Sequence, residues 1–211
     1  MRLLLTVAAA SVLLLCEASN ARADQCAYNT WDWDKRLGKS VNHRRIVKDR
    51  AELSPQERGT IPGCTVCEQD QAEIRAPGLQ PFKVCKALRD PIMRALDRAR
   101  EEGFPIQSVI GYRVGKTKGA LDAQGRRTEF SNHSYGVAID VNAERNGLYD
   151  SCWTFGPQCK LQRGGVYRAD ASGAITPDSA LYRAMRAEGL KWGGEINGKQ
   201  KDFMHFSLNG M

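Results

Sequence analysis

The clearest pattern along the chain is a short apolar run that contains one carboxylate. Residues 137–141 have the sequence Val-Ala-Ile-Asp-Val, which predicts a buried strand because the run is short and partly β-branched. The polar, turn-prone residues 131–136 precede it and contain His133. A buried, ionised carboxylate needs a nearby cation, and neither Lys nor Arg lies on this strand. The pattern therefore predicts a metal ion that Asp140 shares with His133.

A second apolar run near the end of the chain carries another histidine. Residues 201–208 have the sequence Lys-Asp-Phe-Met-His-Phe-Ser-Leu, which predicts a strand around His205 with Asp202 three residues earlier. Two imidazoles and one carboxylate from distant parts of the chain match a catalytic zinc site, where a fourth position stays open for water. Asp202 is then the candidate general base. Because strand residues three apart point to opposite faces, Asp202 must lie at a bend before the strand.

The rest of the chain shows weaker patterns. The expected elements are helices over residues 82–103, with a break at Asp90-Pro91, and over 177–189, a strand at 106–113, a charged and Gly-rich loop across the cleft mouth at 114–130, and a hairpin at 166–175. Together they predict an α+β fold. In this fold a small antiparallel sheet carries the zinc site, helices pack on one side, and disulfides staple the extensions.

The sequence divides into three segments. Residues 1–23 contain Arg2, an apolar run and an Ala-Arg-Ala cleavage site, which predict a secretory signal peptide. Residues 24–81 are polar without a sustained period, and we expect an N-terminal extension wrapped on the core and stapled by disulfides. Residues 82–211 form the expected catalytic domain. The apolar run is too short to predict a retained anchor, so we expect no stable membrane insertion after cleavage.

Cysteine count and charge describe the exported chain further. Cleavage after residue 23 removes Cys16 and leaves six cysteines, which predict three disulfides in an oxidising compartment, periplasmic or extracellular. Sequence leaves about 15 pairings open, and Cys152 with Cys159 is the simplest pair because they flank a Gly-Pro turn. Of 31 basic and 24 acidic residues, cleavage removes two and one, which leaves a net charge of about +6.

Several of these residues carry a family resemblance. The pattern resembles the zinc D-Ala-D-Ala carboxypeptidase and L-Ala-D-Glu endopeptidase family that trims peptidoglycan stem peptides. Its parts are Gly111-Tyr112-Arg113, then Ser131, His133, Gly136, Ala138 and Asp140, then Trp192-Gly193-Gly194, and finally Asp202 to His205-Phe206. The resemblance spans about residues 80–211. One departure is Glu195-Ile196, where the family usually has a further Trp.

The resemblance implies roles for individual residues. It implies a zinc ion held by His133, Asp140 and His205, with Asp202 as general base and Arg113 in contact with substrate. Arg113 is either a surface arginine or, as we prefer, a group that binds a substrate carboxylate or stabilises the oxyanion. Further candidates are Ser131 and Trp192 for substrate binding, with a core position as the alternative for Trp192, and Glu195 as the second choice of base.

The expected function is hydrolysis of an amide bond in a peptidoglycan stem peptide, with Asp202 taking a proton from a zinc-activated water. The basic charge suits these acidic substrates. An alternative from another class is a non-catalytic, zinc-containing cell-wall binding module, which the intact Asp202 disfavours. A chain that binds nucleic acid or anionic envelope polymers has only its charge in favour. We therefore expect no nucleic-acid partner. We also expect the chain to act as a monomer.

Overall fold

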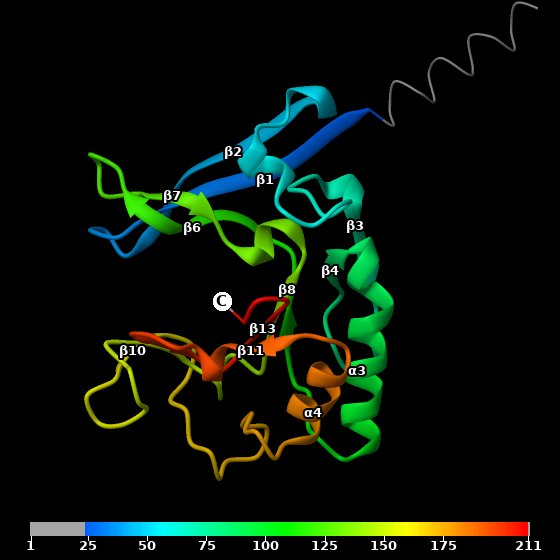
Figure 1. Cartoon of the computed structure of the whole chain (residues 1–211), viewed down its shortest axis with the longest axis vertical. Coiled ribbons are helices and arrows are strands. Elements are labelled where there is room, and N and C mark those ends of the chain that lie inside the picture. Colours follow the sequence, from blue (N-terminus) through cyan, green and yellow to red (C-terminus); the bar gives the residue numbers. More distant parts are fainter. Residues whose placement is uncertain (1–23, 211) are drawn as a thin grey trace, which may run out of the picture.

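The computed structural model describes residues 24–210, and the expected signal peptide at residues 1–23 lies outside the described residues. Within that range the chain forms four small sheets and a few short helices (Figure 1). The predicted α+β class is confirmed, although the sequence indicated one sheet rather than several. In the described part of the chain, no helix is long and apolar enough to cross a membrane.

The first sheet joins a long N-terminal hairpin to a later one, in the order β2-β1-β6-β7. Its strands are β1 (Gln25–Asp34), β2 (Lys39–Asp49), β6 (Val114–Leu121) and β7 (Arg127–Phe130). β1 pairs antiparallel with β2 and parallel with β6. A Cβ at Gly115 would lie 2.4 Å from the ring of Trp31, so glycine permits the close approach of β6 to β1. The predicted loop at 114–130 is therefore wrong, because pairing with β1 outweighs its glycine and charge content.

The second sheet carries two of the predicted metal ligands, in the order β11-β13-β8-β5. Its strands are β11 (Lys191–Trp192), β13 (His205–Ser207), β8 (Ala138–Val141) and β5 (Val109–Ile110). Neighbouring strands are antiparallel throughout, and His205 lies directly opposite Asp140. The predicted small antiparallel sheet is thus present, but its strand β5 is shorter than the strand expected over residues 106–113.

Two smaller sheets flank this one. They consist of β9 (Leu148–Asp150), β10 (Lys160–Arg163) and β12 (Gln200–Asp202) in one, and β3 (Gln71–Ile74) with β4 (Phe82–Cys85) in the other. The predicted hairpin at 166–175 is wrong. Instead of a strand ladder, Tyr167 donates from its hydroxyl to the Ile175 carbonyl at 2.8 Å, and Asn146 accepts from the Ile175 amide at 2.9 Å.

The two longer helices, α3 (Arg89–Glu101) and α4 (Ala180–Ala187), lie beside each other on one side of the second sheet (Figure 1). The ion pairs Arg94–Glu188 and Arg183–Glu102, each at 2.6 Å, connect them. The remaining helical segments are α2 (Pro55–Arg58), η1 (Arg50–Glu52), η2 (Glu68–Asp70), η3 (Lys86–Leu88), η4 (Asn132–Tyr135) and η5 (Gly193–Glu195).

The helix expected over residues 82–103 is correct only in its second half. Its first residues form β4, which pairs with β3, and α3 begins at Arg89 without a side-chain cap from Asp90. The apolar face that α3 presents is buried in a core with α4 and the second sheet. Large members of this core include Ile92, Leu96, Ile139, Leu181, Met185 and Phe206, and burying each stabilises the fold by about 1.5–3 kcal/mol.

Three disulfides pair the six cysteines of residues 24–210, as the cysteine count predicts. They join Cys26 to Cys67, Cys64 to Cys85, and Cys152 to Cys159. The predicted Cys152–Cys159 pair is confirmed. The Cys64–Cys85 bond ties the segment 24–81 to the segment 82–211, which we predicted as extension and catalytic domain. That division remains a prediction, and the first sheet contains strands from both segments.

Candidate functional site

Three buried side chains meet between η4 and the second sheet. Asp140 on β8 and His205 on β13 face each other across an antiparallel pair, so their side chains leave the same face of the sheet. His133 approaches from η4. Asp140 Oδ1 lies 3.0 Å from His133 Nε2 and 3.1 Å from His205 Nδ1. The structure therefore brings together the three residues that the sequence assigned to a metal.

The turn between His133 and Asp140 depends on Gly136. Gly136 ends η4 with a φ of 67°, in the left-handed region that glycine adopts without strain. A Cβ there would lie 2.0 Å from Gln71 Oε1 and 2.4 Å from the Cys85 nitrogen. The chain can therefore reverse from η4 into β8 only with glycine at this position, and the reversal places the first histidine over the strand that carries Asp140.

The hydrogen bonds of His133 test whether a metal fits this cluster. Its Nδ1 lies 2.9 Å from the Gly111 carbonyl oxygen, and its Nε2 faces Asp140. Burial lowers the pKa of His133, against the opposing influence of Asp140, so the neutral ring has one proton for two acceptors. With that proton on Nδ1, the Nε2 lone pair faces a carboxylate oxygen. A cation between the two atoms removes the repulsion, and the residues present fit a metal.

The donor atoms also suit the ion that the sequence predicts. The three ligand atoms, two imidazole nitrogens and one carboxylate oxygen, lie within 4.8 Å of one another. Zinc in catalytic sites takes three such protein ligands and leaves a fourth position open. The bond from His133 to the Gly111 carbonyl is the type of outer contact that fixes the orientation of a ligating histidine.

Arg113 lies against the other oxygen of Asp140. Its Nη2 donates to Asp140 Oδ2 at 3.0 Å, and its side chain is 22% exposed. The sequence argument that no cation lies near Asp140 considered only the strand itself, and Arg113 reaches Asp140 from the connection between β5 and β6. One carboxylate oxygen thus has a permanent positive partner, while the other faces both histidines. The Arg113 Nε is buried without a hydrogen-bond partner among the described residues.

Asp202 occupies the bend that the sequence argument required. It ends β12, and Phe203 and Met204 form a turn before β13 begins at His205. Its Oδ1 is buried and has no hydrogen-bond partner within the described chain. The pKa of Asp202 is raised to about 6, mainly by burial and further by the Asp140 carboxylate, against the opposing charges of His205, Arg113 and Lys118. A carboxylate with this pKa can accept and release a proton near neutral pH.

Gly193, the first of the two glycines that follow Trp192, packs closely against Asp202 and His205. A Cβ at Gly193 would lie 2.4 Å from the Asp202 carbonyl oxygen, 3.0 Å from Asp202 Cβ and 3.1 Å from His205 Cβ. Both the candidate base, Asp202, and the last candidate ligand, His205, therefore pack against the backbone of Gly193. Glycine here allows both to lie close to the cluster.

The other sequence candidates differ in their positions. Ser131 is buried directly before η4, and its Oγ has no hydrogen-bond partner in the described range. Trp192 is 4% exposed, donates from Nε1 to the Phe203 carbonyl at 2.8 Å, and belongs to the main core, the alternative that the sequence left open. Glu195 is exposed and accepts a 2.5 Å hydrogen bond from the Tyr182 hydroxyl, so Asp202 is better placed as base.

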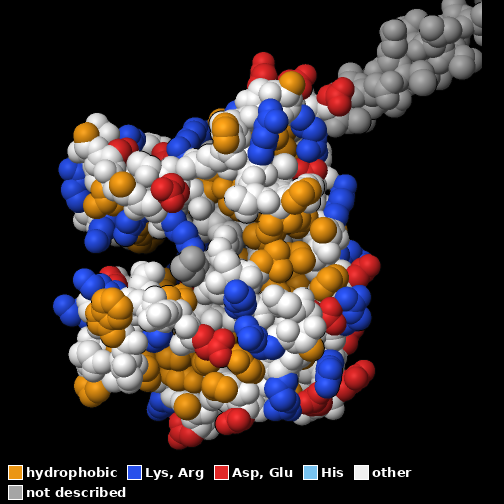
Figure 2. All heavy atoms as spheres, in the orientation of Figure 1, with side chains coloured by type: hydrophobic (Ala, Val, Ile, Leu, Met, Phe, Trp, Pro, Cys, Tyr) orange, Lys and Arg blue, Asp and Glu red, His pale blue; other side chains and the backbone are white. Residues whose placement is uncertain are grey.

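Two cations near Asp202 were missed from the sequence. Burial lowers the pKa of Lys118, while the charge of Asp202 raises it. Burial likewise lowers the pKa of Arg163, which interacts electrostatically with Arg113, Asp140 and Asp202. Figure 2 shows a notch in this face of the molecule between its upper and lower lobes, with Lys and Arg side chains on both sides. Glycine and charge at 114–130 did not indicate which lysine interacts with Asp202.

A buried His-Asp-His group beside a carboxylate with a raised pKa is typical of metal-dependent hydrolases. Residues 124–208 match a family model described as D-alanyl-D-alanine carboxypeptidase, which confirms the resemblance drawn from the sequence. The matched segment contains His133, Asp140, Asp202 and His205, whereas Arg113 precedes it. The match supports a peptidase, with a group that can hold a metal. No solved structure matches the chain.

Proposed function

We propose that the protein is a zinc peptidase that hydrolyses amide bonds in peptidoglycan stem peptides, either as a D-Ala-D-Ala carboxypeptidase or as an L,D-endopeptidase. The observation that carries the proposal is the convergence of two histidines on one oxygen of Asp140, next to Asp202, whose Oδ1 has no hydrogen-bond partner within residues 24–210. His133, Asp140 and His205 would hold the ion. A bound zinc ion lowers the pKa of a water ligand and polarises a substrate carbonyl.

The side chains around the cluster have separate tasks in this proposal. Asp202 takes a proton at Oδ1 and passes it to the leaving amine, which its raised pKa favours. Arg113 holds Asp140 in place through Oδ2, and its remaining N–H groups are available for a substrate oxygen. Ser131 Oγ, buried and without a partner in the described chain, is a further donor for substrate.

The substrate class follows from charge and family together. Stem peptides carry carboxylates. Positive charge gathers near Asp202, which interacts electrostatically with Lys118, Arg163 and Arg113. A basic cleft attracts such acidic peptides and speeds their encounter at low salt. The three disulfides support an exported protein, in the periplasm or outside the cell. We also propose that residues 1–23 are the signal peptide and that the chain acts as a monomer.

The test is incubation of zinc-loaded protein, residues 24–211, with a defined muropeptide, followed by mass spectrometry of the products. We expect Asp202→Asn to keep its zinc and to lose activity by about 10²–10⁴-fold. Glu195→Gln, a matched change in the other carboxylate, should keep activity near that of the wild type. Equal losses in both variants would contradict the choice of base.

The same experiment addresses the alternative of a binding module without turnover. In that case the protein would retain muropeptide in a pull-down, and the mass of the muropeptide would stay unchanged with zinc present. The proposal predicts instead new products that a chelator abolishes and added zinc restores.

A further inference from the structure

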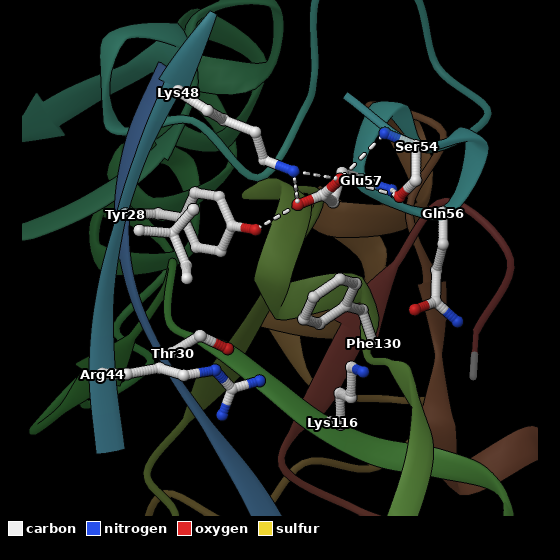
Figure 3. Close-up of a pocket in the computed structure, with 10 residues that line it drawn as sticks. Tyr28, Thr30, Arg44, Lys48, Ser54, Gln56, Glu57, Lys116 and Phe130 are labelled. Carbon is white, nitrogen blue, oxygen red and sulfur yellow. Dashed lines mark hydrogen bonds and ion pairs between the residues drawn. The ribbon is translucent and has the colours of Figure 1, made fainter. Parts of the chain in front are cut away.

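A second pocket lies on the first sheet, outside the His-Asp-His cluster. Its volume is about 250 Å³, and β1, β2, α2 and the end of β7 surround it (Figure 3). Alternate residues of two paired strands form its floor, since Tyr28 and Thr30 lie opposite Ile46 and Arg44. Lys116 and Phe130 close one side. None of these residues belongs to the candidate metal site.

One end of the pocket is a completed polar network. Glu57 accepts hydrogen bonds from the Tyr28 hydroxyl and from Lys48, whose Nζ lies 2.7 Å from Glu57 Oε1. Ser54 adds its hydroxyl and its backbone amide, each at 2.8 Å from Glu57 Oε2. The charges of Lys48 and Glu57 cancel, and the donors are satisfied. This end therefore has a structural role and offers little to a ligand.

The other end has an unsatisfied hydroxyl. Thr30 is 3% exposed, and its Oγ1 is buried without a hydrogen-bond partner among the described residues. Figure 3 shows this oxygen directed into the space between Arg44, Phe130 and Lys116. Buried hydroxyls are nearly always hydrogen-bonded in folded proteins, so a hydroxyl that has no protein partner and faces a pocket is a candidate donor to a group that enters the pocket.

The charges at this end leave one positive group in excess. Arg44 is already paired with Asp32, at 3.2 Å. Lys116 is half-buried, and within the described chain its ammonium has no ion pair, with only the Phe130 ring beneath it at 5.6 Å. One free ammonium and one free hydroxyl suit a single carboxylate, which accepts from both. The Tyr28 and Phe130 rings provide apolar surface for the group that carries it.

We propose that this pocket binds a carboxylate on a small group, such as a peptide terminus or a sugar acid. Its volume lies below the 300–1,000 Å³ typical of sites for drug-sized ligands, so it admits a group of about one or two residues. Lys116 supplies the charge, and Thr30 donates its hydroxyl proton. The site is separate from the proposed catalytic cleft, so its function does not depend on hydrolysis.

The experiment is an NMR titration of zinc-loaded, ¹⁵N-labelled protein with two carboxylates, N-acetyl-D-alanine and N-acetylmuramic acid. Neutral counterparts, N-acetyl-D-alaninamide and N-acetylglucosamine, serve as controls. We expect saturable shifts at the amides of Thr30, Arg44 and Lys116 with at least one carboxylate, and none with its neutral counterpart. The carboxylate that binds more tightly identifies the peptide or the sugar as the source.

Variants connect the binding to the named groups. Lys116→Met should weaken binding by about tenfold, the effect of losing one charged hydrogen bond, and Thr30→Val, of similar shape, by about threefold. Lys39→Met, at an exposed position of β2 outside the pocket, should bind like the wild type. Absent or non-saturable shifts, equal binding of the neutral compounds, or wild-type binding by Lys116→Met would overturn the proposal. Thermal unfolding of each variant verifies its folding.

Discussion

Substitution of Gly193 by alanine tests how precisely Asp202 and His205 must be positioned for activity. The added Cβ would be 2.4 Å from the Asp202 carbonyl oxygen, whereas ordinary contact begins at 3.4 Å. The backbone at Asp202 must therefore move by about 1 Å. Overpacking of this kind costs about 1–3 kcal/mol of stability. A misplacement of about 1 Å at a catalytic group also lowers activity by about a hundredfold.

Gly189 provides a control with a similar loss of stability. It follows α4 with a φ of +83°, and a Cβ there would have no atom within 4 Å. Alanine in this left-handed conformation costs about 1–2 kcal/mol, but it displaces nothing near the cluster. Gly189→Ala should therefore lower the melting temperature about as much as Gly193→Ala and leave kcat/KM unchanged.

The assay for both variants is kcat/KM on a defined muropeptide, together with the melting temperature and the zinc content. We expect a loss of about a hundredfold for Gly193→Ala and none for Gly189→Ala. If the two variants lose stability equally and both keep wild-type kcat/KM, the positions of Asp202 and His205 do not limit the reaction. That result would refute the reasoning from Gly193.

Three further predictions concern metal affinity and stability. Arg113→Met should weaken zinc affinity by about 10–100-fold in a chelator competition, because Asp140 Oδ2 loses its partner; unchanged affinity would exclude that role. The pKa of Glu57 is lowered to about 2, despite burial, by its hydrogen bonds with Lys48 and Tyr28. The ionised Glu57 carboxylate therefore stabilises the fold above about pH 4.5, and this contribution is lost as the pH falls toward 2. Glu57→Gln should therefore reduce the urea-unfolding free energy at pH 6 by about 2 kcal/mol, after allowance for solvent screening, and less at pH 3; a pH-independent loss would contradict this assignment. Removing the Cys26–Cys67 bond should cost about 4 kcal/mol and the Cys152–Cys159 bond about 2.5, because their loops span 41 and 7 residues, and the reverse order in urea unfolding would contradict it.

The sequence was sufficient to predict the candidate metal ligands. Asp140 stands in an apolar run where a lone carboxylate needs a partner, and the two histidines stand in or beside similar runs. The position of Asp202 at a bend followed from strand geometry once Asp202 was taken as the candidate base. Local patterns are reliable here because each one is contained in fewer than ten residues.

The contacts that complete the site depend on segments far apart in the sequence. Arg113 reaches Asp140 from 27 residues away, and the bond from His133 to Gly111 uses a backbone oxygen, which has no sequence signature. The strand at 114–121 forms because β1 lies beside it, with Gly115 against Trp31. Such pairings are set by tertiary structure, which overrides the local preference of a glycine-rich, charged segment.

The most direct test of the account is a crystal structure of zinc-loaded protein with anomalous scattering measured at the zinc edge. The account predicts one ion bound to His133 Nε2, Asp140 Oδ1 and His205 Nδ1, the three atoms that now converge. It also predicts that Asp202 is not a ligand. Zinc bound elsewhere, or no zinc after loading of a folded protein, would contradict it.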